Sequence, residues 1–248
     1  MFTSILTPIV LVALGLAVGS FANVVIDRVP SHRSLRGRSV CDRCRRELRP
    51  WELVPILSAL FLRFRCPTCD GPIALRMLLV EGGIAALFLG AWWTFGFSPR
   101  AIAVVVALTA LVILAVIDLR EHVVPDRVSV PAMIAVAVLR LGEVRPHVVI
   151  IGMLLGAGFF WVQRVVSRGR WVGDGDTRVG ALMGALFSPL HLGIALAASY
   201  VVGGLLAGVL LAMRRAQRGT QVPLVPFLLL GSVVTVFWGD VILRWYGW

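Results

Sequence analysis

Long apolar stretches separated by charged connections limit what this sequence can fold into. Of its 248 residues, 58% are hydrophobic and 15% are charged, and its mean hydropathy is +0.90. A soluble domain carries about 25% charged residues, and roughly 20 apolar residues suffice to cross a bilayer. We therefore expect an all-α polytopic membrane protein with about eight transmembrane helices. The expected spans are 4–26, 73–97, 101–118, 128–142, 147–167, 178–188, 190–213 and 224–244, of which the fourth and the sixth are short.

The arginines predict how these spans are oriented. All 24 basic residues are arginines, and basic residues gather in connections on the cytoplasmic side of a membrane. Connections rich in arginine alternate here with poor ones, so we expect the rich ones in the cytoplasm and both termini outside. The net charge of +11 follows from this orientation, and we expect lipid but no nucleic acid as a partner. The four arginine-rich connections are 27–72, 119–127, 168–177 and 214–223.

The only cysteines form two C-x2-C pairs, Cys41 with Cys44 and Cys66 with Cys69, separated by 21 residues. Four thiolates at this spacing are the usual ligands of a tetrahedral zinc ion, and they leave no position for water, so we expect a structural role. Disulfides and a redox-active pair are the alternatives, but cytoplasmic thiols stay reduced and a redox pair needs no second copy. The chain is then divided into a first span at 1–26, a small zinc-binding domain inserted at 27–72 and a membrane domain at 73–248.

Acidic residues at two span ends are candidates for a chemical function. Asp118 ends a long apolar run, and the stretch GDGD contains Gly173, Asp174, Gly175 and Asp176. Ionisable residues at membrane depth are costly and are usually functional. Two carboxyl groups at similar depth can share a proton, so that one activates water while the other binds the carbonyl of a peptide bond. The glycines allow close backbone approach beside the aspartates. A helix cap and a proton-coupled transporter are the competing interpretations.

Two further acids need an explanation. Glu81 lies about two turns inside the second expected span, where it either packs or contacts a substrate. Asp240 is placed four residues before Arg244, and an ion pair across one helical turn would account for it.

Five motifs in register resemble those of the prepilin peptidase family, the leader peptidases and N-methyltransferases of type IV pilus and type II secretion systems. GLAVGSFANVVIDRVP at 15–30 resembles the signature of the family's first span, and the paired C-x2-C resembles its zinc motif. IDLREHVVPD at 117–126 resembles I-D-x5-L-P-D, with Val124 in place of leucine. GDGDTRVGALMGA from Gly173 resembles G-x-G-D-x-K, with Arg178 in place of lysine. VPLVPFLLLG at 222–231 resembles the last-span motif.

The resemblance implies that Asp118 and Asp176 are the catalytic aspartates of an intramembrane peptidase. It implies cleavage of the leader of type IV prepilins or pseudopilins at the cytoplasmic face of a bacterial inner membrane. It also implies methylation of the new N-terminus with S-adenosylmethionine, for which the sequence offers no glycine-rich loop after a strand, so the cofactor site is unassigned. A peptidase without methyltransferase activity is the main alternative. The other residues in the matching motifs are Gly173, Gly175, Asp126 and Arg178.

The helix ends predict how the two aspartates share charge. Asp176 is expected at a helix N-terminus, whose partial positive charge favours the ionised form. Asp118 is expected at a helix C-terminus, where the protonated form is favoured. The extra acid, Asp174, adds a like charge that favours protonation of one carboxyl group. It is also the residue expected to cap a helix that starts near Thr177.

Overall fold

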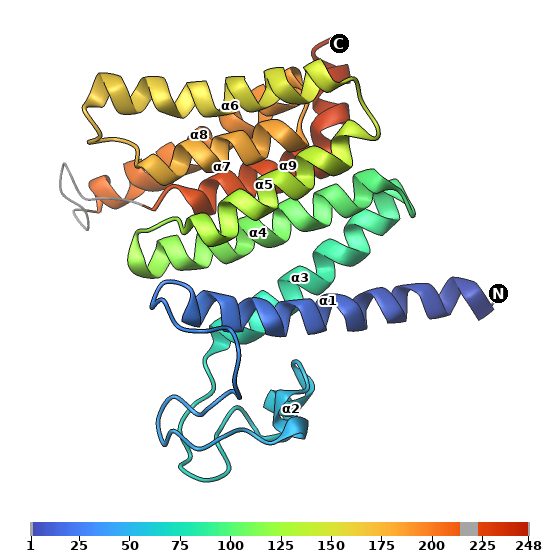
Figure 1. The fold of residues 1–248 in the computed structure, drawn as a ribbon, viewed down its shortest axis with the longest axis vertical. Helices are drawn as coiled ribbons and strands as arrows, with labels where there is room; N and C mark the ends of the chain where they lie inside the picture. Colours follow the sequence, from blue (N-terminus) through green and yellow to red (C-terminus); the bar gives the residue numbers. More distant parts are fainter. Residues whose placement is uncertain (1, 214–222, 248) are drawn as a thin grey trace. The chain divides into compact units, whose positions relative to one another are not determined.

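The computed structural model describes residues 2–213 and 223–247, whose regular structure is helical apart from two isolated β-bridges. The expected all-α fold is confirmed, because each expected span corresponds to one helix (Figure 1). Arg214, Arg215 and Arg218 of the last arginine-rich connection, and Val222 of the last motif, lie outside the described residues. The helices that correspond to the expected spans are α1 (Phe2–Arg28), α3 (Leu75–Phe95), α4 (Pro99–Glu121), α5 (Asp126–Leu141), α6 (Pro146–Ser167), α7 (Asp174–Leu186), α8 (Pro189–Ala212) and α9 (Val225–Trp245).

The chain divides into two compact units, Met1–Trp93 and Thr94–Trp248. The first unit holds α1, the cysteine-containing segment and nearly all of α3. That segment contains a 3-10 helix, η1 (Pro50–Leu53), and a short helix, α2 (Leu57–Phe61). The sequence-based division begins the membrane domain at residue 73, whereas the structure groups α3 with the residues before it.

Six of the helices are long and apolar enough to cross a membrane: α1, α3, α4, α6, α8 and α9. The other two, α5 and α7, have 16 and 13 residues. A helix of 13 residues reaches roughly 20 Å, less than the hydrocarbon thickness of about 30 Å. The count of eight spans is therefore approximate, and its two shortest members are the helices that fall short.

Helix α7 is apolar because protein surrounds it. All eight residues from Val179 to Leu186 are buried. Within the second unit α7 contacts each of the other five helices, α4, α5, α6, α8 and α9. The segment therefore has the hydropathy of a span although its neighbours are side chains. This central position lets its N-terminus present residues to several helices at once.

Glycines allow α6 and α7 to pack backbone to backbone. Gly152 and Gly156 of α6 lie opposite Gly184 and Gly180 of α7, and a Cβ atom on any of the four would overlap backbone atoms of the facing helix. A residue pair spaced by four on each antiparallel helix is the small-xxx-small arrangement of membrane helix interfaces. This close contact fixes the position of α7 along α6, and so the position of the residues at its N-terminus.

We expect Gly180→Ala to lower the free energy of unfolding by about 3 kcal/mol, because the two helices must separate to accept the methyl group. The melting temperature should fall by roughly 6–12 °C, as measured by differential scanning fluorimetry of the purified protein in detergent. Gly158→Ala is the matched control, since a Cβ atom at that position of α6 meets nothing within 4 Å. An equal melting temperature for the two variants would contradict the close packing of α6 and α7.

In the first unit, α1 and α3 pack in the same way. A Cβ atom at Gly15 would lie 2.6 Å from the backbone of α3, and one at Gly19 would lie 2.6 Å from the Glu81 Cα. One turn further along α1, the Asn23 Nδ2 donates a hydrogen bond to the Met77 carbonyl at 3.1 Å. Contacts at every fourth residue explain the G-x3-G-x3-N spacing inside the first-span motif.

Candidate active site and metal centre

Asp118 lies near the C-terminal end of α4, and only 7% of its surface is exposed. Its Oδ2 accepts a hydrogen bond from the backbone N–H of Val225 at 3.0 Å, and the backbone of Leu224 contributes to the same contact. These two residues form the N-terminus of α9. The last-span motif therefore supplies the main-chain donors that hold Asp118.

Asp176 is the third residue of α7, and its Oδ2 accepts a hydrogen bond from the backbone N–H of Gly173 at 2.9 Å. The carboxylate of Asp118 lies close enough for its charge to act on Asp176. The second unit thus brings together the two aspartates that the sequence singles out.

The prediction that Asp174 caps this helix is wrong. Helix α7 begins at Asp174 itself, three residues before the expected start, and Asp176 makes the capping contact to Gly173. A carboxylate at the third helical position can reach back to the N-cap amide, whereas one at the first position cannot. Asp176 is therefore both the capping residue and one of the two aspartates that the sequence singles out.

Helix termini affect the ionisation of both aspartates. Asp176 stands at the N-terminus of α7, as expected, and the partial positive charge there favours its ionised form. Asp118 is near the C-terminus of its own helix but accepts its hydrogen bond from the N-terminus of α9. That contact favours ionisation of Asp118 as well. The helix ends alone therefore do not single out Asp118 as the protonated member.

A chain of ion pairs surrounds the N-terminus of α7. Arg178 pairs with Asp126 of α5 at 2.6 Å and with Asp174 at 2.8 Å, and Arg164 of α6 also pairs with Asp174. Two arginines therefore offset the charge of Asp174, so it adds less like charge to Asp176 than the sequence suggests. These side chains are about a third to three-fifths exposed, and each pair contributes on the order of 1 kcal/mol or less.

Gly175 is needed for close approach. A Cβ atom there would overlap the side chain of Val124, the residue that stands where the family's motif has leucine. The loop between α4 and α5 is thus packed on the first turn of α7. The IDLREHVVPD and GDGD motifs form one contact surface in the second unit.

Sequence reasoning missed three side chains near the aspartates. Tyr200 of α8 donates a hydrogen bond to Gln163 of α6 at 2.9 Å, and the charge of Asp176 acts on its hydroxyl group. His122, directly after α4, likewise acts on Asp118. A tyrosine and a glutamine inside two apolar runs were the available signal, since the chain has only two tyrosines.

The two remaining acids have partners elsewhere. Glu81 of α3 is 8% exposed, and its Oε2 accepts a hydrogen bond from the backbone N–H of Ile56 at 2.8 Å. The expected Asp240–Arg244 ion pair is wrong. Arg244 donates to the Asp240 carbonyl at 3.2 Å, whereas the carboxylate contacts His191 at 2.9 Å.

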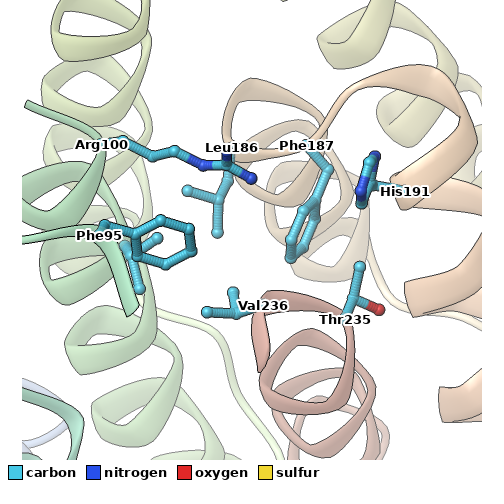
Figure 2. Close-up of a pocket in the computed structure, with 8 residues that line it drawn as sticks. Phe95, Arg100, Leu186, Phe187, His191, Thr235 and Val236 are labelled. Atoms are coloured by element: carbon cyan, nitrogen blue, oxygen red, sulfur yellow. The ribbon is translucent and has the colours of Figure 1, made fainter. Parts of the chain in front are cut away.

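The contacts Ser188–His191–Asp240 use the residue types of a serine hydrolase triad, with distances of 2.8 and 2.9 Å. They join the start of α8 to the end of α9, and the Asp240 side chain is 67% exposed. Figure 2 shows His191 beside a small cavity that Arg100 and Phe187 also line. Its volume of about 20 Å³ holds roughly one water molecule. It does not accept a peptide, so we assign these contacts to helix packing.

The thiol groups of the four cysteines lie close together. Their Sγ atoms all lie within 4.8 Å of one another, and the Sγ atoms of Cys41 and Cys69 are 3.8 Å apart. A tetrahedral zinc with Zn–S bonds of about 2.3 Å requires S–S distances of about 3.8 Å. The residues therefore fit a metal ion of this kind.

The two C-x2-C pairs have the same backbone structure. The N–H of Arg45 donates to the Cys41 carbonyl and that of Asp70 to the Cys66 carbonyl, both at 2.9 Å. Arg45 and Asp70 both have φ angles near +60°. Each pair is closed by one β-bridge. The chain thus forms two equivalent turns that present their thiols toward one point.

A partly buried ion pair supports this centre. Arg46 contacts both Glu52 at 2.8 Å and Cys66. The Arg46 guanidinium and the Arg49 N–H hold the pKa of Glu52 below its ordinary value. The cation beside Cys66 also offsets part of the negative charge that four thiolates bring to a divalent metal.

Comparisons with known proteins agree with this arrangement. Residues 13–95 match the Bacterial Peptidase A24 N-terminal domain, and residues 105–208 match the Type IV leader peptidase family. The chain belongs to the type IV leader peptidase family. No solved structure matches it significantly.

Curated relatives of the family cover almost the whole chain. A prepilin leader peptidase/N-methyltransferase of Pseudomonas aeruginosa is 30% identical over 95% of this chain and 91% of its own length. The protein of that name from Bacillus subtilis is 31% identical over 96% of both. The protein of that name from Myxococcus xanthus is 36% identical over 85% of this chain and 65% of its own length.

The two matched regions follow the division of the structure. The N-terminal domain of the family covers most of α1, the cysteine centre and α3, whereas the leader peptidase region contains Asp118 and Asp176. With six apolar helices of spanning length among the described residues, this member of the family is a multi-pass membrane protein.

Proposed function

We propose that the chain is an aspartic endopeptidase that removes the leader of type IV prepilins or pseudopilins and then methylates the new N-terminus. The observation that carries the proposal is the meeting of Asp118 and Asp176 inside the region that matches the leader peptidase family. The relatives' printed names supply the substrate class and the second reaction.

In the proposed cleavage, one aspartate is ionised and the other is protonated. The ionised carboxylate takes a proton from water as the water oxygen attacks the carbonyl carbon. The protonated partner donates to the carbonyl oxygen. When the C–N bond breaks, the leaving amine takes a proton from one aspartate, and a hydroxyl group of the tetrahedral intermediate returns its proton to the other. The titration belongs to the two groups together.

The surroundings suit this mechanism. The backbone N–H of Val225 donates to one oxygen of Asp118, and that of Gly173 donates to one oxygen of Asp176. Main-chain donors therefore hold both carboxyl groups in place. The ion pair between Arg178 and Asp126 holds the first turn of α7 against α5. Gly175 lets Val124 pack close to Asp176. These motif residues are therefore proposed to position the pair.

For the metal centre we propose a structural zinc held by all four cysteines. Four thiolates leave no open position, so the ion contributes folding energy and takes no part in the reactions. S-adenosylmethionine would supply the methyl group. The described residues contain no strand followed by a glycine-rich loop that could hold its nucleotide part, so we assign no residue to it.

The arginine distribution supports a cytoplasmic location for both sites. The connection 119–127, which follows Asp118, and the connection 168–177, which includes Asp176, belong to the arginine-rich set, as does the cysteine segment. Basic connections stay on the cytoplasmic side. We therefore propose cleavage at the cytoplasmic face of a bacterial inner membrane.

Incubation of the purified protein with a prepilin-like substrate tests the proposal. Mass spectrometry should find the leader removed, and S-adenosylmethionine should add the mass of one methyl group to the product. Cleavage without the added methyl would identify a peptidase only. An uncleaved substrate would reject the peptidase assignment and return attention to proton-coupled transport.

A further inference from the structure

The short helix α2 exposes an apolar face although it is part of a polar segment. Leu57, Leu60 and Phe61 are 51%, 52% and 84% exposed, and Phe64 is 41% exposed. Residues three and four apart share one side of a helix, so Leu57, Leu60 and Phe61 lie together, and Phe64 follows three residues after the helix ends. We call these four residues the α2 face. Ala59, on the opposite side, is 5% exposed. An apolar stripe of this kind marks an interaction surface.

A hydrogen bond places α2 beside the first turns of a candidate membrane span. The Ile56 N–H, directly before α2, donates to Glu81, and the Ile56 side chain lies beside Gly82. Glu81 is six residues after the start of α3, which corresponds to roughly 9 Å along the helix. Because α3 is a candidate span from Leu75 onward, α2 lies beside it at the depth of the first two turns.

The contact with Glu81 also gives the Ile56 N–H a hydrogen-bond partner. A backbone N–H without a partner costs several kcal/mol in hydrocarbon, and the Glu81 carboxylate supplies that partner. Ile56 adopts φ +57°, and Arg63 and Phe64 after α2 have φ +50° and +59°. Such conformations persist for non-glycine residues only where the surroundings hold them. The backbone on both sides of α2 is therefore held in place by its surroundings.

The charges around α2 fit a lipid surface. From Leu53 to Cys69 the chain carries Arg63 and Arg65 and no acid, and both arginines are exposed. Trp51, 61% exposed, adds an aromatic side chain of the kind enriched at membrane interfaces. Arginines beside an apolar stripe are attracted to anionic headgroups.

We propose that α2 is an interfacial anchor: its face inserts at the boundary between headgroups and acyl chains of an anionic bilayer. The anchor ties the metal centre to the membrane between α1 and α3. The occupant of the α2 face is lipid, and the helices of the second unit are the competing occupant.

Photo-crosslinking of the full-length protein in nanodiscs tests this assignment. With p-benzoylphenylalanine in place of Phe61, illumination should yield a lipid adduct on the peptide that contains residue 61. The control carries the same group at Leu35, which is 43% exposed in the same segment, and should yield far less. A crosslink from position 61 to residues 94–248, no lipid adduct, or equal yields at both positions would overturn the proposal.

Hydrogen exchange tests the role of charge. Replacing Arg63 and Arg65 by glutamine should lower the exchange protection of residues 57–62 by up to about thirtyfold in nanodiscs that contain phosphatidylglycerol. In phosphatidylcholine alone the same variant should differ little from the parent. Equal effects in both lipids would reject the electrostatic part of the anchor.

Discussion

Replacing either Asp118 or Asp176 by asparagine is expected to reduce prepilin cleavage by about a thousandfold or more, because proton transfer by a positioned side chain contributes about 10²–10⁴-fold. Asparagine neither ionises nor delivers a proton. Its side-chain oxygen can still accept the hydrogen bond from Val225 at position 118 or from Gly173 at position 176. Folding should therefore be retained while activity is lost, as followed by mass spectrometry of the product and by thermal melting.

Asp174→Asn is the matched control for this experiment. Asp174 lies two residues from Asp176 in the same helical turn and is 53% exposed, paired with Arg164 and Arg178. Removing its charge should change cleavage less than tenfold and stability by about 1 kcal/mol or less. If Asp118→Asn or Asp176→Asn cleaved at the parent rate, or if Asp174→Asn were the inactive variant, the aspartyl pair would be misassigned.

A side chain that cannot cap separates the two roles of Asp176. Asp176→Ala should lose both activity and the contact to Gly173, at an additional cost of about 1 kcal/mol. The asparagine variant keeps the contact, so the difference in melting temperature between the two variants measures the cap alone. Equal melting temperatures would mean that this hydrogen bond contributes nothing to stability.

The helices and the acids could be predicted because both depend on local sequence. Hydropathy over some 20 residues marks a helix wherever it packs, and the apolar run that ends at Asp118 gave α4 to within a few residues. The same signal cannot distinguish lipid from protein as the surroundings. Helix α7 was therefore expected to be a span, whereas its eight residues Val179–Leu186 are buried among five other helices.

The parts of the site that the sequence does not predict are contacts between distant segments. The N–H groups of α9 that hold Asp118 come from residues more than a hundred positions away, and main-chain donors have no residue type to recognise. Asp174 and Asp176 are equally plausible caps from composition. Only the start of α7 at Asp174 decides which of them reaches back to Gly173.

The sequence predicts the four cysteines that lie close together, but it does not predict the residues that support them. The spacing of the cysteines identifies all four, since the ligand set is the motif itself. The bridging position of Arg46, between Glu52 and Cys66, depends on how the two turns face each other. The sequence shows only one arginine among ten in that segment.

Cys44→Ser is expected to remove the metal and unfold most of residues 31–72. Only Ala59, Cys66 and Gly71 are buried there, so the segment has almost no hydrophobic core. Metal binding therefore supplies most of its folding free energy, and its loss should cost several kcal/mol. Elemental analysis of the purified protein should find one zinc per chain in the parent and almost none in the variant.

Trypsin reports the unfolding directly, because it cleaves after arginine and the segment 27–72 contains ten of them. The variant should be cut there far faster than the parent, while part of the prepilin cleavage that we propose for Asp118 and Asp176 should survive. Asp42→Asn is the matched control, since it changes an exposed residue inside the same turn without touching a thiol. A parent without bound metal, or a Cys44→Ser variant that keeps it, would reject zinc as the element that folds this segment.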